Sequence, residues 1–169
     1  MEVFINPLVM PEEFAVKEII RNAMADYEEG KVMTATNRRL ENLFQTYQGK
    51  GSVMVVAKHG TELIGAAGIG PLHGLSLAEG LAEIRDLVVS SHYRRMGIGA
   101  KLIQSCINFA KEQKYKTIYL ETTPTMSGAQ RLFKSFGFRA VVEQNSRGTA
   151  VEQEVPGYYI LDNLILHKS

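Results

Sequence analysis

The chain has 169 residues, of which 45% are hydrophobic and 22% charged, so it carries enough apolar side chains to pack one domain core. The formal net charge of +1 argues against a general surface for nucleic acid, and no stretch reaches the roughly 18 apolar residues of a membrane span. The single cysteine, Cys106, excludes a disulfide framework and a cysteine-based zinc site, so we expect one metal-free domain over residues 1–169 in a reducing compartment, the cytoplasm.

The N-terminal third predicts a short strand at Val3–Ile5 and then two amphipathic helices. Pro11 followed by two glutamates is typical of a helix start. The apolar residues of this helix recur at helical spacing: Val16, Ile19, Ile20, Ala23 and Tyr27. Gly30 is a plausible stop, and a second helix follows Thr36. Its apolar face consists of Leu40, Leu43, Phe44 and Tyr47.

Three strands are predicted in the middle of the chain. Val53–Ala57 is rich in β-branched residues, and after a turn at His59-Gly60 the segment Leu63–Ile69 returns as its partner. Glycines within this second strand either weaken it or mark a close approach by another part of the chain. Leu81–Val89 is the next strand, after a loop.

Helices and strands alternate in the C-terminal half. A helix follows the glycines near residue 97, with its apolar face at Leu102, Ile103, Cys106, Ile107 and Ala110. The next elements are a strand at Lys116–Thr122, a helix at Ser127–Phe136 stopped by Gly137, a strand at Phe138–Glu143, a loop at Asn145–Gly157 and a strand at Tyr158–Leu166. The order β-α-α-β-β-β-α-β-α-β-β predicts an α/β fold, with a mixed sheet of six to seven strands and helices on both faces.

The segment "HYRRMGIGA", residues 92–100, joins the strand Leu81–Val89 to the following helix. A helix N-terminus offers unpaired amides and a positive dipole end, and glycines let phosphate oxygens approach the backbone. The segment lacks the Gly-Lys-Ser/Thr of a Walker loop and the third glycine of a dinucleotide fingerprint. By itself it fits either a pyrophosphate cradle or an ordinary tight turn with solvated arginines.

Its surroundings add a family resemblance. "LAEIRDLVVSSHYRRMGIGAKLI" resembles the acetyl-CoA-binding core of the GNAT superfamily of N-acetyltransferases, whose motif is Arg/Gln-x-x-Gly-x-Gly/Ala. Arg94, Gly97 and Gly99 fill that motif in register. "IYLETTPTMSGAQRLFKSFGFRAV" resembles the part that follows. The specific match runs from about Leu81 to Val141, whereas the first 50 residues match in layout only.

The resemblance implies a GNAT-like fold and an acyltransferase that uses acetyl-CoA as cosubstrate. It implies that the fourth and fifth strands splay apart and that pantetheine pairs with the backbone of Leu87, Val88 and Val89. It further implies a pyrophosphate seat made by Arg94, Arg95, Met96, Gly97, Ile98, Gly99 and Ala100.

The implied reaction moves an acetyl group to a primary amine, which must first lose a proton at a cost of about 4–5 kcal/mol at pH 7. Glu83 is the first candidate base, because it precedes Arg94 by the separation found in some family members. The alternative is a structural hydrogen bond at a strand end. Glu121, at the end of the fifth strand, is the second candidate. Asp86 alternates to the face opposite Glu83 unless a bulge intervenes.

Two positions depart from the family pattern. Phe133 stands where many members carry a tyrosine as general acid, and Met126 stands where an asparagine often contacts the cofactor. Tyr158, Tyr159 or water could supply the proton, or a thiolate with a pKa near 8.5 could leave without help. Cys106 lies on an apolar helix face, which predicts an inert buried thiol and not a covalent acetyl carrier.

The acceptor is not readable from the sequence. Near-zero net charge argues weakly against a strongly basic or acidic acceptor, so a small-molecule amine is slightly favoured. The alternatives are a protein or peptide acceptor, and a non-catalytic module that binds acyl-CoA as a sensor or for docking. An exposed last strand could pair with a second copy, so a homodimer is a further expectation.

Overall fold

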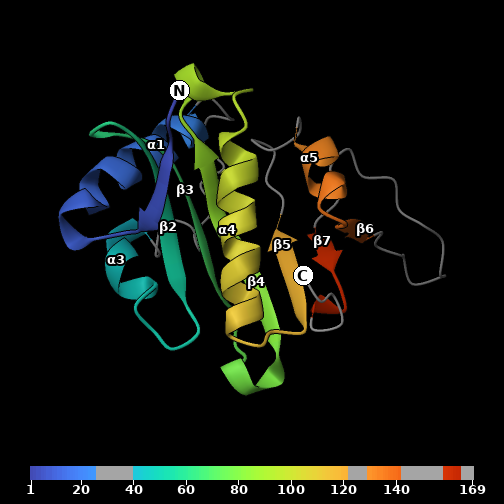
Figure 1. The fold of residues 1–169 in the computed structure, drawn as a ribbon. Coiled ribbons are helices and arrows are strands. Elements are labelled where there is room, and N and C mark those ends of the chain that lie inside the picture. The colour runs from blue at the N-terminus through green and yellow to red at the C-terminus, as the bar shows by residue number, and fades with distance from the viewer. Residues whose placement is uncertain (26–39, 122–128, 142–157, 165–169) are drawn as a thin grey trace.

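The computed structural model describes residues 1–25, 40–121, 129–141 and 158–164, and its centre is a seven-stranded sheet in the order β1-β2-β3-β4-β5-β7-β6 (Figure 1). The strands are β1 (Phe4–Pro7), β2 (Val53–His59), β3 (Glu62–Pro71), β4 (Leu81–Val89), β5 (Thr117–Glu121), β6 (Arg139–Val141) and β7 (Tyr158–Leu161). β4 and β5 run parallel, and the other neighbours run antiparallel. The predicted mixed sheet is confirmed.

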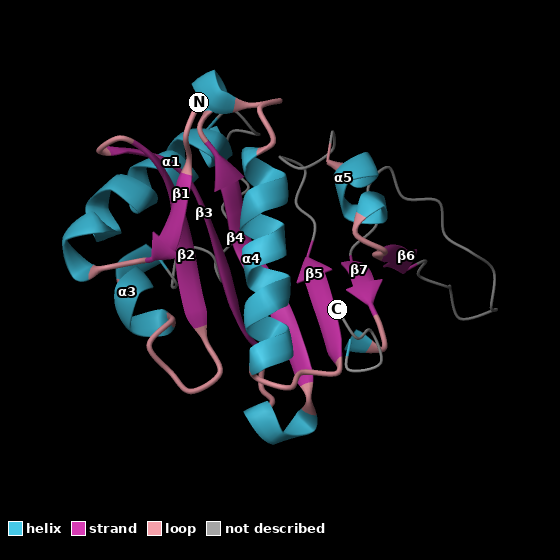
Figure 2. Ribbon diagram, in the orientation of Figure 1, coloured by secondary structure: helices cyan, strands magenta, loops and turns pink. Residues whose placement is uncertain are grey.

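Helices lie on both faces of this sheet, as expected (Figure 2). They are α1 (Glu13–Ala25), α3 (Leu43–Thr46), α4 (Ile98–Glu112) and α5 (Gln130–Ser135). α1 and α3 contribute to one apolar core, and α4 and α5 contribute to another. Short 3-10 turns at Met10–Glu12, Leu77–Glu79 and Ser91–Tyr93 complete the described elements. Among the described helices, none is both long and apolar enough to cross a bilayer.

The core under α4 is the larger of the two. The predicted apolar face of this helix is buried throughout, at Leu102, Ile103, Cys106, Ile107 and Ala110. These side chains pack against strand residues that include Ala57, Ile84 and Ile118. Burial of apolar surface contributes roughly 25 cal/mol per Å², so this larger core contributes more to the stability of the fold than the core under α1 and α3.

The core under α1 and α3 brings the first 50 residues onto the sheet. Val16, Ile20, Leu43 and Tyr47 are buried there, as helical spacing predicts. Gly68 of β3 makes room for Tyr47, because a Cβ atom at Gly68 would lie 2.2 Å from the Cζ atom of that ring. Of the two explanations for the glycines of β3, the structure therefore supports close approach at this position.

Element boundaries differ from the sequence expectation in several places. The first strand is Phe4–Pro7 and not Val3–Ile5. Of the second predicted helix, the described part is helical at Leu40 and Glu41 and again from Leu43 to Thr46. Gly137 ends α5 with a φ of 95°, as expected of a glycine stop. The predicted elements at Gly30, Thr36, Ser127 and Asn145–Gly157 lie outside the described residues.

The last strand is not an edge strand, which corrects the sequence expectation. β7 pairs with β5 on one side and with β6 on the other, so its two backbone edges are occupied. The described edges of the sheet are β1 and β6 instead. Within the described residues, β7 therefore offers no open edge to a second copy, because an edge must be unpaired to accept another strand.

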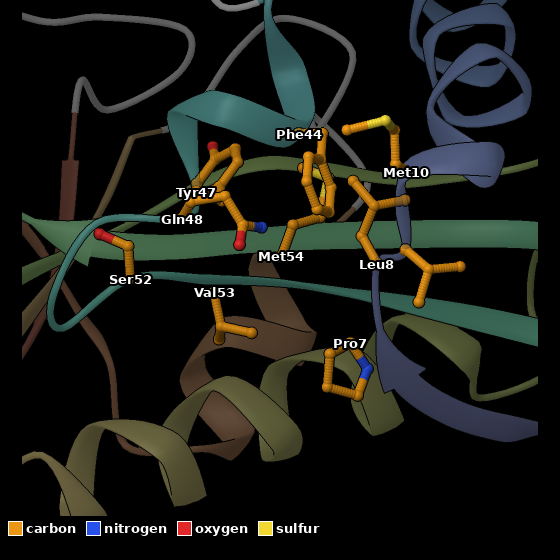
Figure 3. A pocket seen from close by; sticks show the side chains of 10 residues that line it. Pro7, Leu8, Met10, Phe44, Tyr47, Gln48, Ser52, Val53 and Met54 are labelled. Atoms are coloured by element: carbon orange, nitrogen blue, oxygen red, sulfur yellow. The ribbon is translucent and has the colours of Figure 1, made fainter.

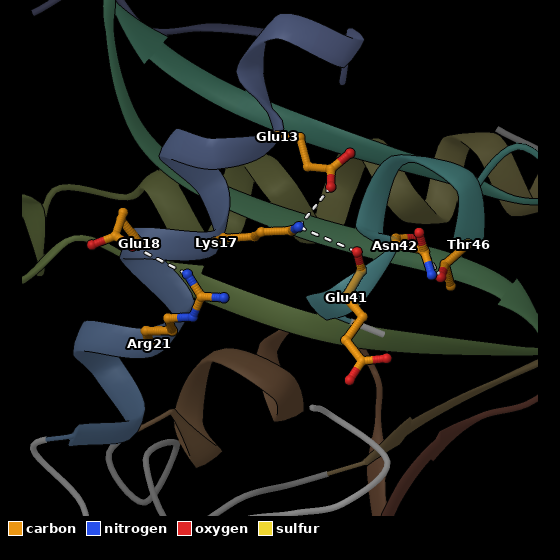
Figure 4. A network of polar contacts seen from close by, with 7 residues as sticks. All are labelled: Glu13, Lys17, Glu18, Arg21, Glu41, Asn42 and Thr46. Atoms are coloured by element: carbon orange, nitrogen blue, oxygen red, sulfur yellow. Dashed lines mark hydrogen bonds and ion pairs between the residues drawn. The ribbon is translucent and has the colours of Figure 1, made fainter. Parts of the chain in front are cut away.

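Polar contacts on the surface of α1 include ion pairs within the helix and one hydrogen bond to the segment before α3 (Figure 4). The Nζ atom of Lys17 lies 2.7 Å from Oε1 of Glu13 and donates a hydrogen bond of 3.4 Å to the carbonyl oxygen of Glu41. Surface pairs one helical turn apart contribute only about 0.3–0.5 kcal/mol. Burial of the apolar face of α1 therefore contributes more than these pairs to holding the helix on the sheet.

Candidate active site

The segment between β4 and α4 forms an exposed turn, which we call the phosphate turn and define as Arg94–Gly97. Arg95 adopts a φ of 63° and Gly97 a φ of 79°, so two residues of this turn lie in the left-handed region. Ile98, Gly99 and Ala100 form the first turn of α4, where backbone amides lack helical partners. The turn thus joins two arginines to a helix N-terminus, an arrangement that attracts anions.

β4 and β5 separate beside this turn. They pair only from Leu81–Ile84 on β4 and Thr117–Leu120 on β5 within the described residues. Beyond Ile84, β4 continues to Val89 and pairs with β3 alone. One backbone edge of this part of β4 is therefore left without a strand partner among the described residues.

Hydrogen bonding fixes which amide points into that opening. The amide of Ser90 donates to the carbonyl oxygen of Ile64 on the β3 side, at 2.8 Å. Successive residues of a strand direct their backbone groups to opposite edges. Val88 therefore faces β3, and the amide of Val89 is directed toward the β5 side.

A groove of about 640 Å³ joins the opening to the phosphate turn. The sequence-predicted residues that line it are Leu87, Val88, Val89, Arg94, Arg95, Gly97, Ile98, Gly99 and Ala100. Tyr93, Ala23, Ala129 and Leu132 complete the lining. Met96 is 54% exposed and does not line the groove. The groove combines an unpaired strand edge at one end with an anion-attracting turn at the other, and this fits a long ligand with a phosphate group.

Glu83 lies on the fully paired half of β4 and is only 3% exposed. Its neighbours across the sheet are Gly70 on β3 and Tyr119 on β5. Its Oε1 atom lies 3.5 Å from Nη1 of Arg85, and that guanidinium lies over the ring of Tyr47 at 5.8 Å. The Arg85 cation stabilises a negative charge on Glu83, so the carboxylate has a compensating partner in a buried place.

Asp86 lies on the same face of the sheet as Glu83, contrary to the alternation expected from the sequence. The register between β3 and β4 shifts between Ala66 and Gly68, and Asp86 adopts a φ of 56° at this bulge. The hydroxyl of Tyr47 donates to Oδ2 of Asp86 at 2.6 Å. The extra residue on β4 thus turns Asp86 toward Tyr47, over which Arg85 also lies.

Glu121 and Tyr158 are paired neighbours on β5 and β7. Tyr119 and Tyr158 also meet edge to face, with ring centroids 6.3 Å apart. The pKa of Tyr158 is raised by partial burial, and then by the carboxylates of Glu121 and Glu83. Both candidate bases therefore act on one phenol, which indicates that they face the same region.

The position of Phe133 is structural. Its side chain is fully buried, and its ring meets that of Tyr159 edge to face at 5.2 Å. Neither ring is among the residues that line the groove. Of the two tyrosines considered as acids, Tyr159 is 1% exposed and Tyr158 is 37% exposed. Met126 lies outside the described residues.

The remaining reactive side chains do not gather into a second centre. Cys106 is fully buried, and burial raises the pKa of its thiol to about 12, so it stays protonated and unreactive. His92 is exposed and does not line the groove. Within the described ranges, no three His, Cys, Asp or Glu side chains are arranged to hold a metal ion.

A smaller hollow of about 300 Å³ lies between β1, β2 and α3 (Figure 3). Leu8, Met10, Phe44 and Met54 give it an apolar wall, and Tyr47 and Gln48 close its other end. Its lining has no arginine, so the larger groove is the better candidate for binding an anionic ligand.

Tyr47, Arg85 and Tyr93 are the residues that the sequence analysis did not connect to the site. Helical spacing predicts the burial of Tyr47 but not its contact with Asp86, which lies 39 residues further along the chain. The sequence offered one signal, for Arg85. It lies two residues after Glu83 on the same predicted strand, and side chains two residues apart share a strand face.

Comparison with known proteins identifies relatives of this arrangement. Residues 17–138 match the family model described as the Acetyltransferase (GNAT) family. The chain is 28% identical to the uncharacterized N-acetyltransferase YjgM of Escherichia coli (strain K12) over 79% of this chain and 80% of that protein. It is 31% identical to N-acetyltransferase 8 of Homo sapiens over 53% of this chain, and that match spans only 40% of the human protein.

Solved structures agree on the fold. The acetyltransferase yncA of Salmonella typhimurium, solved with its cofactor acetyl-CoA, superposes with a TM-score of 0.74 and covers 99% of this chain and 96% of that one. Its sequence identity is 18%, so the similarity concerns the fold.

Proposed function

This chain belongs to the acetyltransferase (GNAT) family, and from that membership we propose that it transfers the acetyl group of acetyl-CoA directly to a primary amine. The observation that carries the proposal is the separation of β4 from β5 beside the phosphate turn. The groove holds an unpaired strand edge, which suits the amide groups of pantetheine, and a set of helix N-terminal amides, which suits a pyrophosphate. Acetyl-CoA carries both groups in one molecule. The complex of a structural neighbour with acetyl-CoA supports the same donor.

The backbone of Leu87, Val88 and Val89 would hold the donor's pantetheine part by strand-like hydrogen bonds. The pyrophosphate would be held by the amides of Arg95, Met96, Gly97, Ile98, Gly99 and Ala100. Arg94 and Arg95 are exposed and add positive charge at the same end of the groove. Since most of these contacts involve backbone atoms, the turn needs small or permissive side chains more than specific ones.

The chemical step forms an N–C bond and breaks a C–S bond. Glu83 would take the proton of the attacking amine, directly or through a water molecule, because a free amine is needed for attack. The amide of Val89 would stabilise the negative charge that develops on the carbonyl oxygen. The thiolate then leaves and takes a proton from solvent or from Tyr158.

Glu121 remains the second candidate base. Its position at the end of β5, on the side of Tyr158, supports this role. The two assignments differ in surroundings, because Glu83 has Arg85 as an ion-pair partner and Glu121 is half-buried beside a phenol. Replacing each glutamate by glutamine and comparing turnover at saturating acetyl-CoA identifies the base, which is the residue whose loss reduces turnover more.

Calorimetry tests the donor. We expect the wild-type chain to bind acetyl-CoA in the micromolar range, as cosubstrates commonly do (about 1 μM to 1 mM). Absence of binding at millimolar acetyl-CoA would overturn the proposal. Binding that is unchanged by Arg94→Ala with Arg95→Ala would remove the two side chains from the pyrophosphate seat and leave its backbone amides to hold the donor.

The acceptor is proposed to be a small-molecule amine, and a protein or peptide acceptor is the alternative within the same chemistry. A panel of small amines and lysine-containing peptides, read by release of the CoA thiol, distinguishes the two. Turnover on peptides alone would replace the small-molecule proposal.

Phe133 supports a second candidate function, that of a non-catalytic module that binds acyl-CoA. A buried phenyl ring at this position cannot donate a proton to a leaving thiolate. Tight binding of acetyl-CoA without thiol release for any amine in the panel would favour this function over catalysis.

A further inference from the structure

The phosphate turn has little packing of its own. Arg94, Arg95, Met96 and Gly97 are all exposed. Arg95 has a φ of 63°, a conformation that requires about 1–3 kcal/mol of support from its surroundings in a residue other than glycine. The conformation of the turn is therefore set by what fixes its two ends.

One end is fixed by burial and the other by a tyrosine. Ile98 is 1% exposed and anchors the start of α4 in the core. On the other side, Tyr93 packs partly against the same core. The main chain before it is tied to the sheet, because Ser90 donates to Ile64 at 2.8 Å and Tyr93 donates to Ser90 at 2.9 Å.

The side chain of Tyr93 reaches the tip of the β2–β3 hairpin. Its hydroxyl donates to Oε2 of Glu62 at 2.6 Å, and its ring meets the imidazole of His59 edge to face at 6.2 Å. His59 and Glu62 are cross-strand partners at the two ends of the hairpin turn. Tyr93, the residue just before the phosphate turn, therefore connects this turn to two residues of a separate hairpin.

The hydrogen bond is of the stronger kind, because its acceptor is a carboxylate. That bond to Glu62 is also the main cause that raises the pKa of Tyr93, so the phenol remains protonated and able to donate near neutral pH. The hydrogen bond joins residues 31 positions apart in the sequence, and it is not one of the contacts proposed above for the donor.

We infer that Tyr93 is a positioning residue, and that its hydrogen bond to Glu62 holds the phosphate turn in the conformation that binds the donor. The inference rests on the proposed function, since it assumes that this turn receives the pyrophosphate of acetyl-CoA. It assigns Glu62 a role that its charge alone would not predict.

Two explanations of Glu62 predict opposite effects of its removal on acetyl-CoA affinity: its charge repels the anion, or its hydrogen bond holds Tyr93. A carboxylate near an anion-binding turn repels the anion, so its removal strengthens binding if electrostatics alone matter. If Glu62 acts by holding Tyr93, its removal loosens the turn and weakens binding. The sign of the change therefore separates the two explanations, and it also separates positioning from a direct contact between the Tyr93 hydroxyl and phosphate.

The experiment measures acetyl-CoA affinity by calorimetry for Tyr93→Phe, Glu62→Ala and the double variant. We expect each single variant to bind about threefold to tenfold more weakly, as for the loss of one hydrogen bond. The double variant should bind no more weakly than the weaker single variant, because the two residues form one interaction. Glu62 does not line the groove, so turnover of Glu62→Ala at saturating acetyl-CoA should fall by less than its affinity for acetyl-CoA.

Two further variants complete the design. Glu112→Ala removes the same charge from an exposed position at the far end of α4 and should leave the affinity unchanged. Glu62→Gln keeps an oxygen acceptor without the charge and should recover part of the lost affinity. Thermal melts verify that all variants are folded.

The outcomes are separable. Equal or tighter binding by Glu62→Ala overturns the inference, and so does an additive loss in the double variant. If the wild-type chain binds acetyl-CoA and every variant binds it equally well, the inference alone fails. If the wild-type chain does not bind acetyl-CoA, the proposed function fails and the inference with it.

Discussion

The two halves of β4 have the same backbone direction but different surroundings. Leu81–Ile84 pairs with β3 on one side and β5 on the other, and Ala82 and Ile84 of this half are buried in the main core. The following residues as far as Val89 pair with β3 only, after a bulge at Asp86. The first half therefore satisfies its backbone within the sheet, whereas the second has one edge without a strand partner among the described residues. One strand can thus be a core element at one end and offer an open backbone edge at the other when a neighbouring strand diverges partway along it.

The largest expected effect tests whether the fully paired half also carries the chemistry. Glu83→Gln should lower kcat by about 10²–10⁴, the usual contribution of a positioned general base. Acetyl-CoA affinity should stay the same, because Glu83 does not line the groove. Steady-state kinetics and calorimetry measure the two quantities.

The control for this prediction is Glu79→Gln, at an exposed position just before β4. It should leave both quantities unchanged. Wild-type turnover in Glu83→Gln would remove Glu83 from the mechanism and leave Glu121 as the candidate base.

The next effect concerns stability and compares the halves directly. Ile84 is 1% exposed, so Ile84→Ala should lower the free energy of unfolding by about 2–4 kcal/mol through lost burial and a residual cavity. Val89→Ala, at a half-buried position beside the groove, should lower it by only about 1 kcal/mol. Urea denaturation provides both values. Equal losses would mean that the open half is as important to the core as the paired half.

A smaller effect on stability separates backbone strain from ligand binding at Gly97, in the turn that follows the open half of β4. Gly97 and Gly74 both have a φ of 79°, and a Cβ atom at either would meet no atom within 4 Å. Gly97→Ala and Gly74→Ala should therefore each lower the unfolding free energy by about 1–2 kcal/mol, the cost of a Cβ atom in the left-handed region. Only Gly97→Ala should also weaken acetyl-CoA binding, because its Cβ atom lies in the phosphate turn. Matched losses of affinity would contradict the assignment of that turn.

The smallest effect on turnover is expected at Cys106, which lies on α4 in the larger core. Burial raises the pKa of its thiol to about 12, so near neutral pH the group stays in the unreactive thiol form. A thiol reagent should label the unfolded chain and leave the folded chain unlabelled, and Cys106→Ala should retain wild-type turnover. Lost turnover in that variant would revive an acetyl-enzyme mechanism.

Several features of the protein were predictable because they depend on neighbours in sequence. The apolar spacing of residues 98–112 predicts α4 and its buried face, since one helical repeat places those side chains together. The order of elements predicts a mixed sheet, because the strand–helix–strand connection of β4, α4 and β5 requires a parallel pair. The glycines and arginines before α4 predict an anion-attracting turn for the same local reason.

Other features depend on contacts between distant residues, and the sequence pattern does not contain them. Alternation places Asp86 opposite Glu83, but a bulge against β3 reverses its side, and the bulge depends on how two strands align. The insertion of β7 between β5 and β6 likewise depends on the packing of the whole sheet.

The sequence by itself thus indicated the family, the order of the elements and an anion-attracting turn before α4, because these follow from local periodicity and a contiguous motif. Only the tertiary structure decided which side chains meet beside that turn and which surround Glu83. Tyr93 reaches Glu62 and Tyr47 reaches Asp86 across 31 and 39 residues, respectively, and such hydrogen bonds exist only once the strands and helices have packed.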